Sequence, residues 1–193
     1  MILFQGRPLA LIYLALLGIW LLGEVGLLVR RRATTGLVTR DRGFLRLVLI
    51  VVPLINFAAI LALKFVRGAT FATHLTSVVG LVLMSAGLLL RWWAVIHLGR
   101  FFTVNVAVSA DQRVVDSGPY RLIRHPAYTG ILLLSAGAGV CFGNVVSFMV
   151  IMIPITALML KRIRVEEEAL AEAMGDAYRG YMSRTKRLIP MIY

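Results

Sequence analysis

The sequence predicts an all-α integral membrane protein with five transmembrane helices, the last two of which form a tight C-terminal helical hairpin. Of its 193 residues, 60% are hydrophobic and 16% are charged, and the mean hydropathy is +0.86. A soluble domain of this size cannot bury so much apolar surface. The net charge is +12, and the basic residues that produce it lie beside the apolar runs. That position is typical of cytoplasmic loops facing anionic lipids, so we expect membrane lipids and no nucleic acid as partners.

Three apolar runs in residues 1–99 predict the first three spans. They are Leu9–Val29, Leu47–Leu63 and Phe71–Leu90. Each has enough residues to cross a bilayer, or nearly so. Glu24 lies near the end of the first run, and we expect it at the membrane interface rather than as an intramembrane functional acid. The third run continues through Arg91, Trp92 and Trp93, which suit a snorkelling cation and an aromatic belt.

Residues 127–160 predict the C-terminal hairpin. This stretch contains no charged residue, and it is too long for one spanning helix but short for two. Gly143 and Asn144 break it in the middle, so we expect two helices joined by a tight turn. Gly139 and Gly143 are spaced as a small-xxx-small pair, which favours close packing of the two limbs.

Three basic segments determine the expected orientation. They are residues 30–46, residues 100–124 and the tail from Lys161. All three fall on one side of the membrane if the chain has five spans and its N-terminus is outside. The positive-inside rule makes that side cytosolic.

The stretch from Gly118 to Tyr128 is polar and cationic, although it lies between two strongly apolar runs. Gly118-Pro119 ends one segment, and His125-Pro126 begins the next, because Pro is well tolerated in the first turn of a helix. An Arg-, His- and Tyr-containing helix start at a membrane interface suits an anionic ligand or a cofactor carboxylate. The alternative is an ordinary positive-inside loop with an aromatic anchor.

Charged residues directly after the last span form a second candidate cluster. Arg162 and Glu166 are four residues apart and share one helical face. Three consecutive acids, Glu166 to Glu168, break the positive-inside trend on the same side as His125 and Tyr128. The alternative is a surface ion pair on a solvated helix face. Cysteine occurs once and no Cys/His cluster has metal-ligand spacing, so no metal site is predicted.

Taken together, the spaced residues resemble the isoprenylcysteine carboxyl methyltransferase family, which shares a cofactor-binding half with phospholipid methyltransferases. In chain order they are Gly118-x-Tyr120-x-x-x-Arg124-His125-Pro126-x-Tyr128-x-Gly130, Glu166-Glu167-x-x-Leu170, Gly175-x-x-Tyr178-x-x-Tyr181 and Thr185-x-Arg187-x-x-Pro190. The resemblance extends from about Phe101 to Pro190, whereas the first two spans carry no signature. A chain this compact resembles prokaryotic members, which implies a prokaryotic inner membrane.

The resemblance implies an S-adenosylmethionine site in a cytosolic pocket. Within a single membrane domain, residues 1–99 would supply three spans and residues 100–193 the cofactor-binding and catalytic half. The implied cofactor contacts are Asn105, Gln112, Arg113, Val114, Val115, Tyr120, His125, Pro126, Ala127, Tyr128 and Glu166. Gln112, Arg113 and Val114 match the family by offset alone. Arg162 matches a substrate-contacting arginine, and the implied catalytic residues are Arg162, Glu166 and Glu167.

Three functions remain open from the sequence. The favoured one is methyl transfer from S-adenosylmethionine to the carboxylate of an isoprenylcysteine-like or other lipophilic or lipidated substrate. The second is N-methylation of a phospholipid amine, which needs Glu166 or Glu167 as a base. The third is a non-catalytic membrane scaffold that binds lipids or partners through its basic loops.

Overall fold

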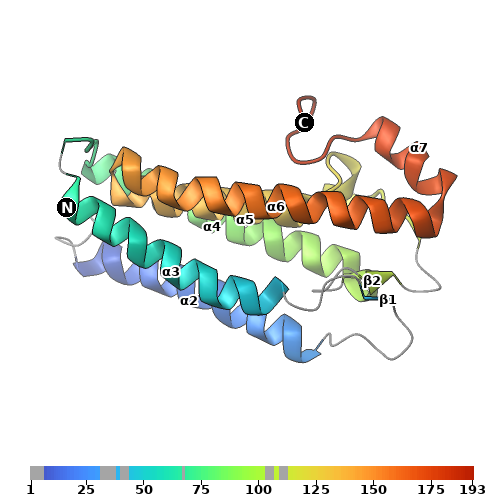
Figure 1. Cartoon of the computed structure of the whole chain (residues 1–193), viewed down its shortest axis with the longest axis horizontal. Coiled ribbons are helices and arrows are strands. Elements are labelled where there is room, and N and C mark those ends of the chain that lie inside the picture. Colours follow the sequence, from blue (N-terminus) through green and yellow to red (C-terminus); the bar gives the residue numbers. More distant parts are fainter. Residues whose placement is uncertain (1–6, 31–37, 40–43, 67, 103–106, 109–112) are drawn as a thin grey trace.

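The structure is a computed structural model that describes residues 7–30, 38–39, 44–66, 68–102, 107–108 and 113–193. Five long helices run side by side along the longest axis of the molecule (Figure 1). They are α2 (Arg7–Arg30), α3 (Phe44–Phe65), α4 (His74–Leu98), α5 (Pro126–Phe142) and α6 (Val145–Met174). The predicted helical class is confirmed. The departure from it is a two-residue antiparallel pair of strands, β1 (Val38–Thr39) and β2 (Ala107–Val108).

Three of these helices, α2, α4 and α6, are long and apolar enough to cross a membrane. The apolar parts of α3 and α5 are shorter. Much of the apolar surface points outward: only 17% of the apolar window of α2 is buried, and Leu22, Leu89 and Ile153 are exposed. Such surface would be a liability in water but suits contact with lipid. The chain is therefore an integral membrane protein.

Helices α4 and α5 form the most extensive contact of the bundle, and glycines allow it. A Cβ on Gly87 of α4 would lie 2.6 Å from the main-chain oxygen of Gly130 on α5, and a Cβ on Gly80 would lie 2.7 Å from that of Gly137. Small residues let two backbones approach this closely. The predicted close packing of the hairpin limbs holds at Gly139, where a Cβ would lie 3.2 Å from the Cα of Phe148 on α6, but not at Gly143, which lies against Ala72.

Gly143 and Asn144 form the turn between α5 and α6, which confirms the predicted break. Gly143 has φ +60° and ends α5 in the left-handed conformation that glycine adopts without strain. Asn144 then caps α6, accepting a hydrogen bond from the N–H of Ser147 at 3.0 Å. Its amide also donates to the carbonyl of Val66 at 2.8 Å. Gly139 lies against Phe148 of α6, whereas Gly143 lies against Ala72.

The polar segments meet at one end of the bundle. Strand β1 precedes α3 and pairs with β2, which follows α4, in the register Val38↔Val108 and Thr39↔Ala107. Helix α7 (Asp176–Arg184) lies at this end too, far from the N-terminus (Figure 1). Gly175 ends α6, and Asp176 at the start of α7 accepts a hydrogen bond from Arg179 Nη1 at 3.1 Å. The described parts of the three basic segments therefore lie at the same end of the molecule.

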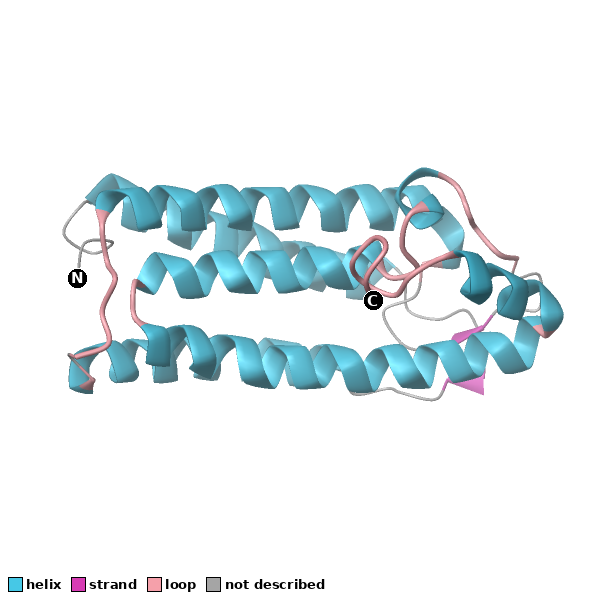
Figure 2. Ribbon diagram, turned by 90° about the horizontal axis from the view of Figure 1, so that it is seen from above, coloured by secondary structure: helices cyan, strands magenta, loops and turns pink. Residues whose placement is uncertain are grey.

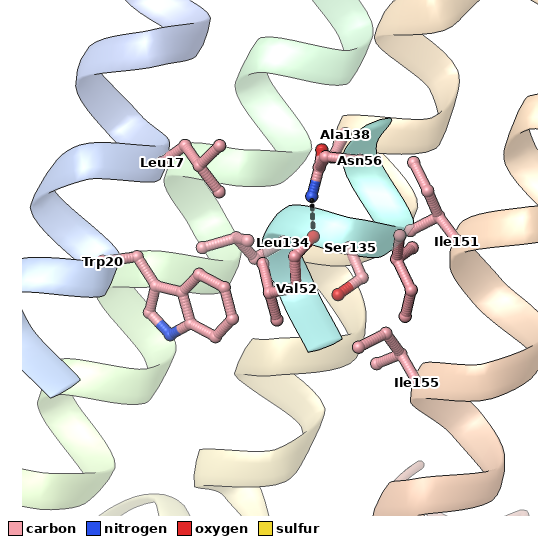
Figure 3. Close-up of a pocket in the computed structure, with 10 residues that line it drawn as sticks. Leu17, Trp20, Val52, Asn56, Leu134, Ser135, Ala138, Ile151 and Ile155 are labelled. Carbon is pink, nitrogen blue, oxygen red and sulfur yellow. Dashed lines mark hydrogen bonds between the residues drawn. The ribbon is translucent and has the colours of Figure 1, made fainter. Parts of the chain in front are cut away.

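A small cavity of about 10 Å³ lies among α2, α3, α5 and α6 (Figure 3). Its walls include Trp20, Val52, Leu134 and Ile155. Asn56 also borders it, but its amide already donates to the carbonyl of Val52 at 2.9 Å. A space of this size holds at most one water molecule. None of the predicted site residues lines it, so the candidate site must be sought at the polar end.

Candidate functional site

The candidate site begins at the first turn of α5. His125 is the N-cap residue and Pro126 the first helical residue, as the sequence predicted. The C-terminal segment, residues 185–193, folds back beside this turn (Figure 2). The N–H of Arg124 donates to the carbonyl of Lys186 at 2.8 Å, and that of His125 donates to the carbonyl of Arg187 at 3.0 Å. The turn is therefore held from outside the helix by main-chain bonds.

Glu167 of α6 joins three parts of the chain at this turn. Its carboxylate accepts from Arg124 Nε at 2.8 Å and from Arg187 Nε at 2.9 Å, and it lies 3.3 Å from His125 Nε2. Only 4% of Glu167 is exposed. A buried carboxylate is costly unless charged donors satisfy it, as they do here. Arg187 gains correspondingly: its hydrogen bonds to Glu167 and Tyr193 raise its pKa.

Arg124 is the central donor of this network. Besides Glu167, its guanidinium donates to the carbonyl of Met182 at 2.9 Å and to that of Thr185. The sequence motif contained Arg124 and Arg187, but sequence reasoning gave neither a role. Their importance depends on the C-terminal segment folding back, which no local spacing reveals.

Tyr128 connects the two charged residues that were predicted to share a face of α6. Its hydroxyl donates to Glu166 Oε2 at 2.6 Å and accepts from Arg162 Nε at 2.9 Å. Arg162 is buried and Glu166 is half-buried. The structure therefore brings Arg162, Glu166 and Tyr128 together in one hydrogen-bonded chain between α5 and α6.

Tyr120 and Ala127 lie in a neighbouring apolar cluster with Ala94 of α4, and Val115 packs against it. Tyr120 belongs to a short 3-10 helix, η2 (Gly118–Arg121). Its hydroxyl donates to the carbonyl of Ala94 at 3.3 Å, and its own carbonyl accepts from Tyr181 at 2.6 Å. Burial raises the pKa of Tyr120, and it raises that of Tyr181 to about 12. Both hydroxyls therefore stay protonated and act as donors at neutral pH.

The remaining predicted contacts are less centrally placed. Arg113 is exposed, with its guanidinium 5.9 Å from the ring centroid of Phe101, and Val114 is half-buried. Asn105 and Gln112 lie outside the described residues. Among the residues that the structure describes, no three His, Cys, Asp or Glu side chains gather as metal ligands.

Two charged residues of the predicted spans, Glu24 and Arg91, form a buried ion pair. Arg91 Nε and Nη2 donate to the two carboxylate oxygens of Glu24 at 2.5 and 2.6 Å. The two residues are 4% and 5% exposed, so Arg91 does not extend to water and Glu24 is enclosed by protein. The predicted position of Glu24 at the membrane interface stays a prediction. Opposite charges inside two apolar helices do signal a buried pair, because an unpaired charge in the membrane is costly. Sequence reasoning treated each residue separately and missed it.

Comparisons with known proteins agree with the motif resemblance. The model of the isoprenylcysteine carboxyl methyltransferase (ICMT) family matches residues 78–172. A probable protein-S-isoprenylcysteine O-methyltransferase from Oryza sativa subsp. indica is 32% identical over 118 residues, which are 60% of this chain and 62% of the relative. The Schizosaccharomyces pombe protein-S-isoprenylcysteine O-methyltransferase is 30% identical over 131 residues, 67% of this chain and 55% of the relative. The matches thus span little more than half of these relatives.

The fold has a counterpart among solved structures. The eukaryotic intramembrane Ras methyltransferase ICMT superposes with a TM-score of 0.70 at 22% identity, covering 97% of this chain and 69% of that chain. At this identity the likeness establishes a shared fold. The matched region contains α5, most of α4 and α6, and every residue of the Arg162–Tyr128–Glu166 chain. Together these comparisons agree with the resemblance found in the motifs: residues 78–172 match the model of the isoprenylcysteine carboxyl methyltransferase family.

Proposed function

We propose that this chain is an S-adenosylmethionine-dependent methyltransferase that methylates the carboxylate of an isoprenylcysteine-like or other lipophilic substrate at the membrane. The observation that carries the proposal is the hydrogen-bonded chain Arg162–Tyr128–Glu166 at the polar end of α5 and α6. It places a cation suited to a carboxylate beside an anion suited to an amino group, in the region that matches the family. The anion suits the amino group of the methyl donor, and the cation suits the carboxylate of the acceptor.

The residues present fit the cofactor. Glu166 has a second carboxylate oxygen to receive the amino group of S-adenosylmethionine, while Tyr128 orients the first. The rings of Tyr120 and Tyr128 offer apolar faces suited to adenine or to the positively charged sulfonium. His125 is buried against Glu167, so we assign it the positioning of the α5 start. When bound, the cofactor would supply a methyl group on a sulfonium that leaves as a neutral thioether.

Arg162 is the residue we assign to the acceptor. A guanidinium can hold a carboxylate bidentately and aim one of its oxygens. A carboxylate is already ionised at neutral pH, so the reaction needs no general base. Arg162 would hold the acceptor oxygen toward the methyl group that the bound cofactor would supply, and no residue of this chain would have to move a proton. The work of this chain is then positioning and the exclusion of water.

The state of the two glutamates favours a carboxylate acceptor over a phospholipid amine. N-methylation needs a base that removes a proton from an ammonium group. Glu167 is held ionised by Arg124 and Arg187, and Glu166 accepts from Tyr128. Burial alone would raise the pKa of Glu167, but its hydrogen bonds to His125, Arg187 and Arg124 lower that pKa, which makes Glu167 a poor base. We therefore assign Glu167 the role of fixing the site rather than of proton transfer.

We propose further that the N-terminus is outside and that the site faces the cytosol of a prokaryotic cell. The basic segments before α3 and after α4, together with the tail after α6, support this orientation, because Lys and Arg accumulate on the cytosolic side. Their arrival at one end of the bundle is what five spans would produce.

The proposed function is tested by titrating purified protein in detergent with S-adenosylhomocysteine. We expect Glu166→Gln to weaken binding by about tenfold or more, since it removes a charge-assisted hydrogen bond. Glu168→Gln, an exposed acid two residues away, is the control and should bind normally. Arg162→Lys should bind the cofactor but lose turnover. Equal affinity in the wild type and Glu166→Gln would refute the role given to Glu166.

The acceptor is tested with labelled cofactor and two lipids. We expect transfer to a farnesylcysteine analogue to give an ester that mild base cleaves, and no transfer to phosphatidylethanolamine. The reverse result would favour the amine N-methyltransferase. Binding of neither cofactor nor acceptor would favour the non-catalytic scaffold.

A further inference from the structure

We propose that the buried Glu24–Arg91 pair is a positioning pair that fixes the first turn of α5, and with it the candidate cofactor site. This inference rests on the proposed function, because two of its readouts are cofactor affinity and turnover. It extends the site to α2, since Glu24 precedes the region that matches the family.

The pair connects three helices at one point. Arg91 of α4 binds both carboxylate oxygens of Glu24 on α2, at 2.5 and 2.6 Å. Its third donor, Nη1, lies 3.4 Å from the carbonyl oxygen of Ala127 on α5. A planar guanidinium held bidentately by one carboxylate has little freedom to turn. Glu24 therefore determines where Arg91 presents its remaining donor.

The carbonyl that Arg91 reaches belongs to the candidate site. Ala127 lies between Pro126, the first residue of α5, and Tyr128, whose hydroxyl joins Arg162 to Glu166. It also packs with Tyr120 and Ala94, one turn along α4 from Arg91. The ring of Phe102, centred 6.0 Å from the guanidinium carbon of Arg91, borders the same cluster. A shift of Arg91 would therefore move Ala127 and the side chain of Tyr120 that packs with it, and both are predicted cofactor contacts.

Stability alone gives no reason for this pair. A buried ion pair often stabilises a protein less than well-packed apolar residues of similar volume would. Helices α4 and α5 are already brought together by the close approach of Gly87 and Gly130. What apolar side chains in place of Glu24 and Arg91 would lack is a hydrogen-bond donor aimed at the carbonyl of Ala127.

The first test removes both charges. Glu24→Gln or Arg91→Met alone leaves one buried charge without its partner, so both should unfold at a lower temperature. The double variant Glu24→Gln/Arg91→Met should recover most of the wild-type melting temperature. Its affinity for S-adenosylhomocysteine and its turnover should nevertheless stay about tenfold or more below wild type, as expected for a misplaced site. Recovery of stability and of function together would overturn the inference, because the pair would then be structural only.

The second test keeps the charge and the fold. Glu24→Asp shortens the side chain by one methylene and should draw the guanidinium toward α2. We expect a raised KM for the cofactor, faster amide hydrogen exchange at residues 127–131 and little change in melting temperature. Glu168→Asp, the same change at an exposed position of α6, is the control. Wild-type KM and exchange in Glu24→Asp would refute the inference.

The two proposals can fail separately. If the wild type does not bind S-adenosylhomocysteine, the proposed function is wrong, and the hydrogen exchange of residues 127–131 still decides the positioning role. If the wild type binds and methylates normally but the Glu24 and Arg91 variants match it, only the positioning role is wrong.

Discussion

At the scale of single residues, the hydroxyl of Tyr128 connects the two charged residues of the candidate site. It accepts from Arg162 and donates to Glu166, so it links the cation and the anion through one hydroxyl group. A phenol in this position fixes the direction of both side chains. The ring below it supplies the apolar face that the sulfonium or adenine of a cofactor would need.

Removing this hydroxyl should separate the effect of its hydrogen bonds from the effect of the aromatic ring. We expect Tyr128→Phe to keep the ring but to lower the affinity for S-adenosylhomocysteine by about tenfold or more, the value of one hydrogen bond to a charged group. Tyr13→Phe is the matched control, because its hydroxyl donates to Asn56 at 2.6 Å inside the bundle. The control should lose stability and keep its affinity in the same titration. An unchanged affinity in Tyr128→Phe would contradict the role given to the hydroxyl.

The residues that the sequence identified, and those it missed, differ in one physical respect. His125 and Tyr128 could be found because they lie at a helix start marked by proline, and Glu166 because it follows the change from apolar to charged residues within α6. Glu24 and Arg91 are 67 residues apart, and only the packing of α2 on α4 shows that they meet. A charged residue in an apolar run indicates that a residue of opposite charge lies beside it, but the sequence does not identify that residue.

At the scale of elements, the hairpin of α5 and α6 could be predicted because its turn is local. Gly143 and Asn144 each do what their own side chains favour, a left-handed residue followed by a helix cap. The packing of α5 on α4 could not be predicted in the same way. The glycines of both helices are visible in the sequence, but which of them face each other depends on the rotation of each helix.

A side chain at this contact should force the helices apart. A Cβ on Gly87 would lie 2.5 Å from the main-chain nitrogen of Leu134 and 2.6 Å from the oxygen of Gly130, and backbone atoms cannot move aside cheaply. We expect Gly87→Ala to lower stability by about 1–3 kcal/mol, measured as a fall in melting temperature in detergent. Gly18→Ala on α2, where no atom lies within 4 Å of the added Cβ, should be neutral or slightly stabilising. A Gly87→Ala variant as stable as wild type would mean that the α4–α5 contact is looser than described.

At the scale of the whole molecule, the site is built from segments distant in the chain. Helix α5 supplies His125 and Tyr128, α6 supplies Arg162 and the glutamates, and the C-terminal segment closes the corner through Arg187. The membrane bundle brings the first two together, whereas polar contacts at its end hold the third. We therefore expect the C-terminal segment to detach before the bundle melts.

Weakening the bond between Arg187 and Glu167 should show this order. We expect Arg187→Gln to speed proteolysis of residues 185–193 and to weaken cofactor binding, while the melting temperature of the bundle changes little. The neighbouring Lys186→Gln, whose side chain is exposed, should leave both unchanged. Limited proteolysis with mass spectrometry measures the first effect and calorimetric titration the second. Equal cleavage rates for the two variants would show that Arg187 does not hold the segment.

Glu167 also has a consequence for how the protein is made. Its partners Arg124 and His125 leave the ribosome 43 and 42 residues before it, and Arg187 follows 20 residues after it. While the nascent chain is inserted, Arg124 and His125 are therefore made before the carboxylate that pairs with them. Glu167 in turn is made before Arg187. Translation that stops after α6 would therefore yield a chain in which Glu167 of the candidate site lacks Arg187 as a donor.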